Sequence, residues 1–177
     1  MTGRTQISLN EAIKANNLDR VKELIEQGSN KNRALNKACR AGQLDIVKYL
    51  AQQGVNIHKH CEAALRIACE NEYIDIIKFL VLEDADIQAR DDEALRQACY
   101  FEHLEVVKLL LEYGADIHAC GGKPLVNACE YNHLEVVILL LEYGADVSVD
   151  NYTSLEKACC FGDLKVFNYL LEYGVNF

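Results

Sequence analysis

Residues 104–117 read LEVVKLLLEYGADI, and residues 134–147 read LEVVILLLEYGADV, nearly the same sequence 30 residues later. The spacing of 30 extends in both directions from these two copies. A leucine or isoleucine recurs at positions 44, 74, 104, 134 and 164, and an Ala-Cys pair recurs at 38–39, 68–69, 98–99, 128–129 and 158–159. Five copies in one register indicate a tandem repeat, in which each copy is one structural unit.

A sixth, altered copy precedes these five. Leu9 and Ala12 lie at the same internal offsets, but the loop that closes this copy is four residues shorter, and Ile13 replaces the repeated cysteine. Its second half carries Arg20 and Glu23 where the later copies have apolar or aromatic residues. A stack of repeats needs a polar outer face on its terminal units. We therefore expect the first copy to cap one end of the stack.

Within a copy, the apolar residues have helical spacing. Leu95, Ala98 and Cys99 lie at i, i+3 and i+4, which places them on one face of a helix. Helices of about eight to ten residues are marginal alone in water, so they must bury such stripes against each other and against the next copy. Glycine closes most copies, because a Cβ disfavours the left-handed conformation that ends a helix. Asp84 replaces it in the third copy, where we expect the weakest helix C-cap.

The two quoted runs resemble the second half of an ankyrin repeat, and the resemblance extends from about Ser8 to Phe177. It implies an all-α ankyrin-repeat solenoid of six helix–turn–helix units in a single domain, 1–177. The expected repeats are about 8–33, 34–63, 64–93, 94–123, 124–153 and 154–177. The usual ankyrin period is 33 residues. Because three residues are missing from the finger that links the units, we expect shortened, irregular finger loops.

The period of 30 and the Leu-x-x-Ala-Cys signature are most similar to ankyrin proteins encoded by large DNA viruses of amoebae. That similarity implies a viral protein whose partner is a host protein. No apolar run approaches the ~20 residues needed to cross a bilayer, and residues 1–6 lack the apolar core of a signal peptide. We therefore expect no membrane association and a cytoplasmic protein, in the host cytoplasm if it is viral, with the nucleus left open.

The net charge of the chain indicates which classes of partner it can bind. The net charge is −9, with 18 Lys and Arg against 27 Asp and Glu. Nucleic-acid binders usually present a basic stripe, because phosphate contacts supply most of their affinity. We expect no nucleic-acid partner, and an acidic surface favours basic partners.

The cysteines and histidines do not form a recognisable chemical site. The cysteines of the Ala-Cys pairs are one repeat apart, about 8–10 Å, which is farther than a disulfide allows. We expect them to be buried free thiols, with Cys61, Cys120 and Cys160 exposed. The cluster His58–Cys61 lies two repeats from His118, too far to share a metal ion. With no catalytic constellation and no phosphate loop, we expect no metal, no cofactor and no enzymatic activity.

The resemblance implies where a partner binds. In the ankyrin family, the two positions after each Ala-Cys pair face the concave groove and contact the partner. These positions vary between copies, and the candidate partner-binding residues are Arg40, Glu70, Tyr100, Phe101, Glu130, Tyr131 and Phe161. Aromatic residues are enriched at interface hot spots, but rings also pack in the core between repeats. Both interpretations stay open for Tyr100 and Tyr131, whereas core or turn packing is favoured for Phe101 and Phe161.

The finger-loop tips are a second candidate surface, because they differ in every repeat, although unconstrained loops differ too. The candidates there are His58, His60, Asp91, His118 and Tyr152. His103 and His133 occupy one position in successive repeats, where the resemblance implies a structural role in the turn between the two helices.

The sequence thus predicts a non-enzymatic scaffold that binds another protein through its concave groove and loop tips. The alternative is a self-assembling structural protein, because the last copy keeps an apolar second helix with Leu164, Leu170 and Leu171. That end either folds its apolar atoms inward, docks onto another copy to give a homo-oligomer, or continues the stack with a longer partner.

Overall fold

The computed structural model describes residues 7–55, 57–149, 152–161 and 164–174, with side chains for all of these except 57–62, 161, 173 and 174. Within these ranges the chain forms twelve α-helices, one closing turn of π-helix and no strand. The elements are α1 (Leu9–Lys14), α2 (Leu18–Glu26), α3 (Lys31–Arg40), α4 (Leu44–Gln52), α5 (Ile57–Glu70), α6 (Ile74–Leu82), α7 (Ala89–Tyr100), α8 (Leu104–Glu112), α9 (Ala119–Glu130), α10 (Leu134–Glu142), α11 (Thr153–Phe161), α12 (Leu164–Tyr169) and the π-turn η1 (Leu170–Gly174). The predicted all-α class of helix–turn–helix units is confirmed.

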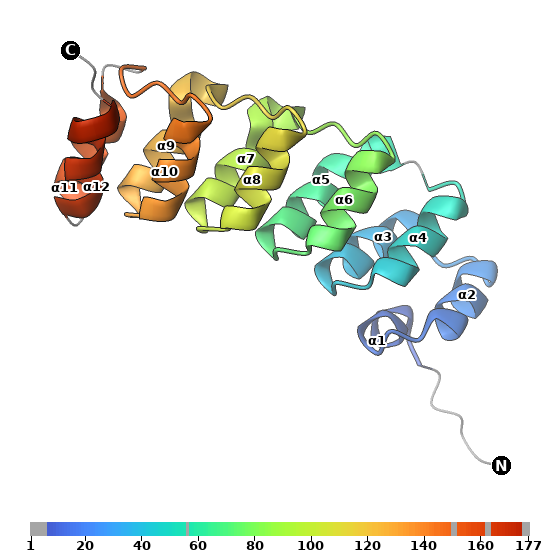
Figure 1. Cartoon of the computed structure of the whole chain (residues 1–177). Helices are drawn as coiled ribbons and strands as arrows, with labels where there is room; N and C mark the ends of the chain where they lie inside the picture. The colour runs from blue at the N-terminus through green and yellow to red at the C-terminus, as the bar shows by residue number, and fades with distance from the viewer. Residues whose placement is uncertain (1–6, 56, 150–151, 162–163, 175–177) are drawn as a thin grey trace. The chain divides into compact units, whose positions relative to one another are not determined.

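Two compact units make up the chain, Met1–Asp86 with helices α1 to α6 and Ile87–Phe177 with helices α7 to α12. Within each unit the helices lie in pairs, and a tight turn joins the two helices of a pair at one end (Figure 1). A longer segment leads from the other end to the next pair. First helices pack on first helices, as α7 does on α9, and second helices on second helices, as α8 does on α10.

The core of each unit is built from the repeated apolar positions. Leu35 and Leu95 are fully buried, and Leu65 and Leu125 are 2% exposed. Burying one such side chain contributes about 1.5–3 kcal/mol. The alanines of the Ala-Cys pairs are at most 1% exposed, so a larger side chain there would overpack the helix contacts.

The repeated cysteines follow the prediction in all but one repeat. Free, buried thiols occur at Cys39, Cys69, Cys99 and Cys129, and exposed thiols at Cys120 and Cys160, as expected. The expectation of burial is wrong for Cys159, which is exposed. In the part of the chain that the structure describes, α11 belongs to the last helix pair, so no further first helix packs over Cys159. Cys61 lies outside the residues whose side chains are described.

The connectors within unit Ile87–Phe177 are short, as predicted, but they are more regular than expected. Residues 90–92 and residues 120–122 each place three consecutive residues in the left-handed region, with φ between 50° and 77°. A left-handed turn therefore precedes the regular part of α7 and of α9. Glycine takes this conformation at little cost, and positions 121 and 122 are glycines.

The left-handed turn at the start of α7 carries no glycine and is held by side chains. A left-handed residue with a Cβ costs roughly 1–2 kcal/mol. The buried carboxylate of Asp92 accepts a hydrogen bond from the backbone N–H of Asp116 at 2.9 Å. The Arg96 guanidinium donates to the carbonyl oxygens of Asp91 and Arg90 at 2.9 and 3.0 Å. These bonds offset the conformational cost.

Asp84 keeps the helix ending that glycine provides in other repeats. Its φ is 63°, and that of Gly114 is 89°. The N–H of Asp84 donates to the Val81 carbonyl oxygen at 3.0 Å, as the N–H of Gly114 donates to that of Leu111 at 3.0 Å. The geometry is therefore shared, and the weaker C-cap remains a prediction about free energy.

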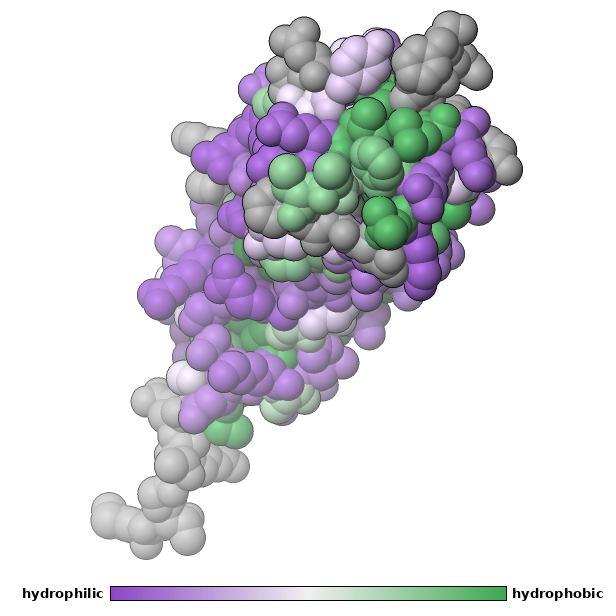
Figure 2. Space-filling view, turned by 90° about the vertical axis from the view of Figure 1, so that its left-hand side faces the viewer, coloured by the Kyte–Doolittle hydropathy of each residue, from purple (hydrophilic) through white to green (hydrophobic). Residues whose placement is uncertain are grey.

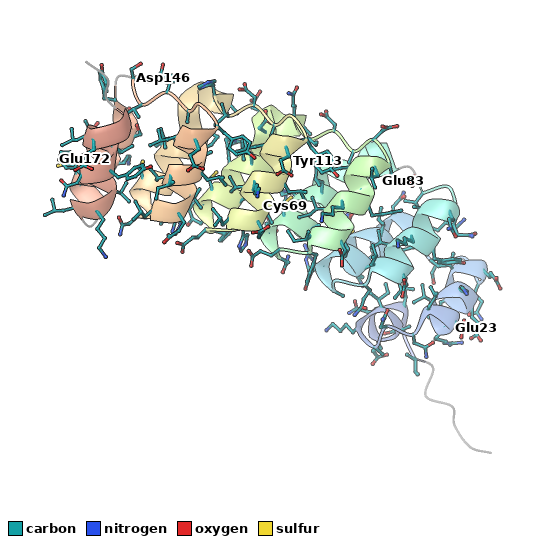
Figure 3. All side chains as sticks on the ribbon, in the orientation of Figure 1. Glu23, Cys69, Glu83, Tyr113, Asp146 and Glu172 are labelled. Atoms are coloured by element: carbon teal, nitrogen blue, oxygen red, sulfur yellow. The ribbon has the colours of Figure 1, made fainter. Side chains whose placement is uncertain are left out.

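The two terminal helix pairs differ in polarity. On α2, Arg20 and Glu23 form an ion pair at 2.6 Å, and Glu23 projects from this helix (Figure 3), as expected of a cap. In the last pair Leu170 is fully buried, but Leu164 is 70% exposed and Leu171 39% exposed. Figure 2 looks onto this end of unit Ile87–Phe177, where hydrophobic side chains gather at the surface. The apolar residues of the last pair thus fold inward only in part.

Candidate functional site

Three aromatic side chains form an exposed cluster in unit Ile87–Phe177, which we call the aromatic patch: Tyr100, Phe101 and Tyr131. Tyr100 ends α7, while Phe101 and Tyr131 are the C-cap residues of α7 and α9. The ring centroids of Tyr100 and Tyr131 are 4.4 Å apart, and those of Tyr100 and Phe101 4.8 Å apart, both edge-to-face. The side chains are 38–46% exposed. The rings contact each other across two repeats instead of entering the core.

Two histidines support the patch from the turns that follow α7 and α9. The ring of Phe101 stacks on His103 at 5.8 Å, and that of Tyr131 on His133 at 6.1 Å. Phe101 therefore packs on the turn, which is one of the two arrangements favoured for it, and not in the core. The stacking leaves the remaining ring edges and faces open to a partner.

His133 also ties the two repeats together. Its Nε2 lies 2.9 Å from the carbonyl oxygen of Tyr100, and its Nδ1 lies 3.3 Å from a carboxylate oxygen of Glu102. A carbonyl only accepts hydrogen bonds, so Nε2 carries the proton that is donated. This contact holds the last turn of α7 against the start of α10, which agrees with the structural role expected for this histidine.

Carboxylates border the aromatic patch. Glu130, next to Tyr131 in the chain, pairs with Lys157 at 3.1 Å, and Glu102 is half exposed. The pKa of Tyr131 is raised, first by a hydrogen bond with the Tyr100 side chain, then by burial and by the nearby phenol and Glu130 charges. The Tyr131 phenol therefore stays neutral at physiological pH.

The other candidates from the groove positions do not join this patch. Arg40 is an exposed residue at the end of α3, and Glu70 pairs with Arg66 on α5. Both belong to unit Met1–Asp86. Phe161 ends α11, but its side chain lies outside the described residues.

The loop-tip candidates are spread over several connectors. The side chains of His58 and His60 lie outside the described residues. His118 and Tyr152 are exposed, and Asp91 lies in the left-handed turn at the start of α7. Asp91 lines a cavity of about 320 Å³ together with Gln88, Asp92, Asp116, Ala119 and Cys120. Among the residues that the structure describes, no group of three or more His, Cys, Asp or Glu is placed to hold a metal ion.

Two contacts between repeats were not foreseen. Lys157 reaches from α11 to Glu130, and the Asn127 side-chain amide on α9 donates to the Arg96 carbonyl oxygen on α7 at 3.0 Å. Each contact has one partner, Glu130 or Asn127, close to Tyr131 in the sequence, and each ties that repeat to a neighbouring one. The recurrence of histidine at 103 and 133 was the signal for their shared role, but no periodic pattern marks Asn127 or Lys157.

The family follows from a comparison with family models. The model for ankyrin repeats in three copies matches residues 9–91 and again residues 95–177. The chain belongs to the ankyrin-repeat family. Proteins of this family generally mediate protein–protein interactions and are typically non-enzymatic scaffolds.

A solved ankyrin structure agrees with the assignment. The crystal structure of the human ASB11 ankyrin repeat domain is similar with a TM-score of 0.81 and 28% sequence identity, over 95% of this chain and 84% of that one. A comparison with curated proteins found no match. None of the described helices is long and apolar enough to cross a bilayer.

Proposed function

We propose that this ankyrin chain is a non-enzymatic scaffold, a single domain over 1–177, that binds another protein through the aromatic patch. The observation that carries the proposal is the exposure of three mutually packed rings, 38–46% each, at the positions that contact partners in the family. Exposed apolar side chains that cluster in one contiguous patch often mark a protein–protein interface. Tyrosine in particular is enriched among the residues that dominate binding energy.

The packing of the patch supports rigid recognition. Tyr100 already contacts Tyr131 and Phe101, and the two histidines stack beneath the rings. Because the rings are held before a partner arrives, little side-chain entropy is lost on binding. Glu102 and Glu130 give the border negative charge, which favours a partner segment with apolar and basic residues.

The sequence supports further proposals about the binding surface, the kind of partner and the location. The loop tips, with Asp91, His118 and Tyr152, add a variable second surface beside the groove. The similarity to ankyrin proteins of amoeba-infecting viruses supports a viral origin, a host protein as the partner and the host cytoplasm as the location. The acidic charge of −9 supports a protein partner over a nucleic acid.

The test is capture of a partner from the lysate of an amoebal host by the wild-type chain and by a Tyr100→Ala/Tyr131→Ala variant. A matched control is Tyr113→Ala/Tyr143→Ala, because these tyrosines are equally exposed, at 40% and 42%. They end the second helices, and Tyr113 lies at the far end of α8 from the turn that follows α7 (Figure 3). Circular dichroism verifies that all three proteins are equally helical.

Loss of the captured protein with the first variant alone supports the proposal. The affinity of the isolated partner should fall at least about tenfold, since truncating a hot-spot residue costs about 2 kcal/mol or more. Equal capture by all three proteins would contradict the proposal and direct attention to the loop tips or to the last helix pair.

The apolar end of unit Ile87–Phe177 favours self-assembly as a second candidate function. Leu164 and Leu171 are exposed on the last pair, and hydrophobic side chains gather on that face (Figure 2). Two copies that meet through this face would bury it. Sedimentation velocity over a dilution series tests this with Leu164→Ser, and with Leu82→Ser as control because Leu82 is 73% exposed on α6. A monomer mass at every concentration would exclude self-assembly.

A further inference from the structure

Unit Met1–Asp86 contains a cavity of about 410 Å³ between α1 and α3. Its lining residues are Asn10, Ile13, Lys14, Lys37, Arg40 and Ala41. Ile13 is only 1% exposed and is the buried part of the lining, whereas Lys14 and Arg40 are exposed and Lys37 is half-buried. Three cationic residues and one residue with a side-chain amide therefore contribute to a lining whose buried part is apolar.

Among the residues that the structure describes, none of the three cations of this cavity forms an ion pair with a carboxylate. Within the part of the chain that the structure describes, no Asp or Glu oxygen lies within 4.0 Å of the charged groups of Lys14, Lys37 or Arg40. Other cations of the same unit do pair, as Arg20 does with Glu23 and Arg66 with Glu70. Three unpaired cations around one cavity are unexpected in a chain with a net charge of −9.

The acidic side chain of α1 is engaged elsewhere. Glu11 accepts hydrogen bonds from the backbone N–H and the hydroxyl of Ser8, each at 2.8 Å. These bonds are the main reason that the pKa of Glu11 is lowered, and the charge of Lys14 is a smaller cause. Glu11 thus serves the N-terminal cap of α1, and Lys14 follows three residues later, in the last turn of this short helix.

Helix ends explain part of this arrangement. Lys14 lies in the last turn of α1, and Lys37 and Arg40 in the last turn of α3, where the helix dipole favours cations. The partial charge of each helix end is only about half an elementary charge. Two such ends do not balance three full positive charges, and the dipole does not require the side chains of two helices to line one cavity.

We propose that this cavity binds an acidic residue of a partner protein. The carboxylate would lie between Lys14, Lys37 and Arg40, with the Asn10 amide as a further donor, and the aliphatic stem would contact Ile13 and Ala41. Hydrogen bonds from cations to a carboxylate are about twice as strong as neutral ones. The inference rests on the proposed protein-binding function, but it concerns a site in the other unit of the chain from the aromatic patch.

The charge of the whole chain selects among anionic occupants. A nucleic acid would bring many phosphates towards a protein with 27 acidic residues against 18 basic ones, and it would be repelled outside the cavity. A single carboxylate on a short segment meets only the local positive charge. The occupant that fits is therefore an acidic side chain of a folded or extended protein segment.

Amide chemical-shift titration of the full chain by NMR tests the proposal. The probe is an acetylated, amidated peptide of sequence Gly-Leu-Glu-Glu-Leu-Gly, and its counterpart carries glutamine at both acidic positions. The expected result is a saturable shift of amides at the ends of α1 and α3 with the glutamate peptide only. Rising ionic strength should weaken this binding, because part of the attraction is screened.

A pair of charge-matched variants separates the cavity from general electrostatics. Lys37→Gln/Arg40→Gln removes two lining cations, and Arg33→Gln/Lys48→Gln removes two exposed cations that do not line the cavity. The first variant should weaken peptide binding about tenfold or more, because hydrogen bonds from charged groups to a carboxylate are about twice as strong as neutral ones. The second should bind within about twofold of wild type, since surface charges interact weakly through water.

Several outcomes would overturn the proposal. Equal binding of the glutamine peptide, equal loss in both variants, or shifts away from α1 and α3 would each do so. If inorganic phosphate or a single-stranded oligonucleotide bound the cavity more tightly than the glutamate peptide and displaced it, the ligand of the cavity would be a phosphate and not an acidic side chain. Concentration-dependent shifts of the cavity amides without peptide would indicate a second copy of the chain as occupant.

The design keeps the two proposals distinguishable. Tyr100→Ala/Tyr131→Ala should leave the peptide titration unchanged, because these residues belong to the other unit. If the peptide fails to bind while the wild-type chain still captures a partner through its tyrosines, only the cavity proposal is overturned. If the peptide binds at the cavity but the tyrosine variant captures the same partners as wild type, only the aromatic-patch proposal is overturned.

Discussion

Replacing Asp84 by glycine should stabilise the end of α6. Asp84 is exposed and adopts φ 63°, whereas Gly54 and Gly114 close their repeats at φ 72° and 89°. A residue with a Cβ costs roughly 1–2 kcal/mol in this region, and aspartate somewhat less. Glycine also loses more backbone freedom on folding, and this entropic cost offsets roughly 0.5–1 kcal/mol of the stabilisation. The net gain in the free energy of unfolding should be about 0.5 kcal/mol.

The reciprocal change tests the same reasoning with the opposite sign. Gly114 ends α8 with the same backbone hydrogen bond, and a Cβ there would meet no atom within 4 Å. Gly114→Asp therefore introduces the conformational cost without a steric clash. It should lower the free energy of unfolding by about as much as Asp84→Gly raises it.

Urea denaturation followed by circular dichroism measures both variants. Hydrogen exchange of the Ala85 amide, which donates to the Leu80 carbonyl oxygen at 3.0 Å, reports the helix end directly. Exchange at Ala85 should slow in Asp84→Gly. Loss of stability in Asp84→Gly would refute the reasoning, because it would mean that the aspartate side chain contributes more than its backbone conformation costs.

Three further predictions concern packing, thiol reactivity and pH. Gly122→Ala should lower the free energy of unfolding, measured in urea, by about 1–2 kcal/mol, because φ is +77° and the new Cβ would lie 3.1 Å from Val149 Cγ1. Gly121→Ala is the control and should cost less, because no atom lies within 4 Å of its Cβ. Equal losses in the two variants would show that the contact with Val149 contributes nothing. Iodoacetamide at pH 8, mapped by mass spectrometry, should label the exposed thiols Cys120, Cys159 and Cys160 in the folded protein. Burial raises the pKa of Cys39 and Cys129 to about 12 and raises that of Cys69 and Cys99 as well. These four thiols should therefore react only after unfolding. If they were labelled in the folded protein as fast as Cys120, their burial would be contradicted. The bonds from Ser8 lower the pKa of Glu11 from its ordinary value of 4.5, so their stabilisation is present above that value and is lost as pH falls through the lowered pKa. The stability difference between wild type and Ser8→Ala should therefore shrink in acid, and a difference that does not change with pH would remove Glu11 from the explanation.

The helical framework was predictable from local sequence alone. The spacing of Leu95, Ala98 and Cys99 sets one face of a helix whatever surrounds it, because 3.6 residues complete a turn. Helices that short need neighbours, so the repeated stripe also implied the stacking of pairs. The left-handed helix end at Asp84 followed from its place in the register, where most other copies have glycine.

The candidate site was predictable only as a set of positions. Tyr100, Phe101 and Tyr131 were recognised as variable residues after the Ala-Cys pairs, but their spacing is compatible with the core and with the surface. Whether such a ring is covered depends on what the next repeat places against it, and here His133 holds the turn so that the rings meet outside the core. Cys159 shows the same dependence, because each of its buried equivalents is followed by a further helix pair in the part of the chain that the structure describes.

Sequence by itself determined the family, the repeat register, the helices and the residues that fill the core, because these depend on spacing along one helix. Tertiary structure alone decided the exposure of the aromatic patch, the hydrogen bond between the Asp116 N–H and the Asp92 carboxylate, and the lining of one cavity by Lys14, Lys37 and Arg40. Those features depend on atoms from two repeats approaching within a few ångströms. A one-dimensional pattern does not contain such distances, since they are set by how neighbouring helix pairs pack.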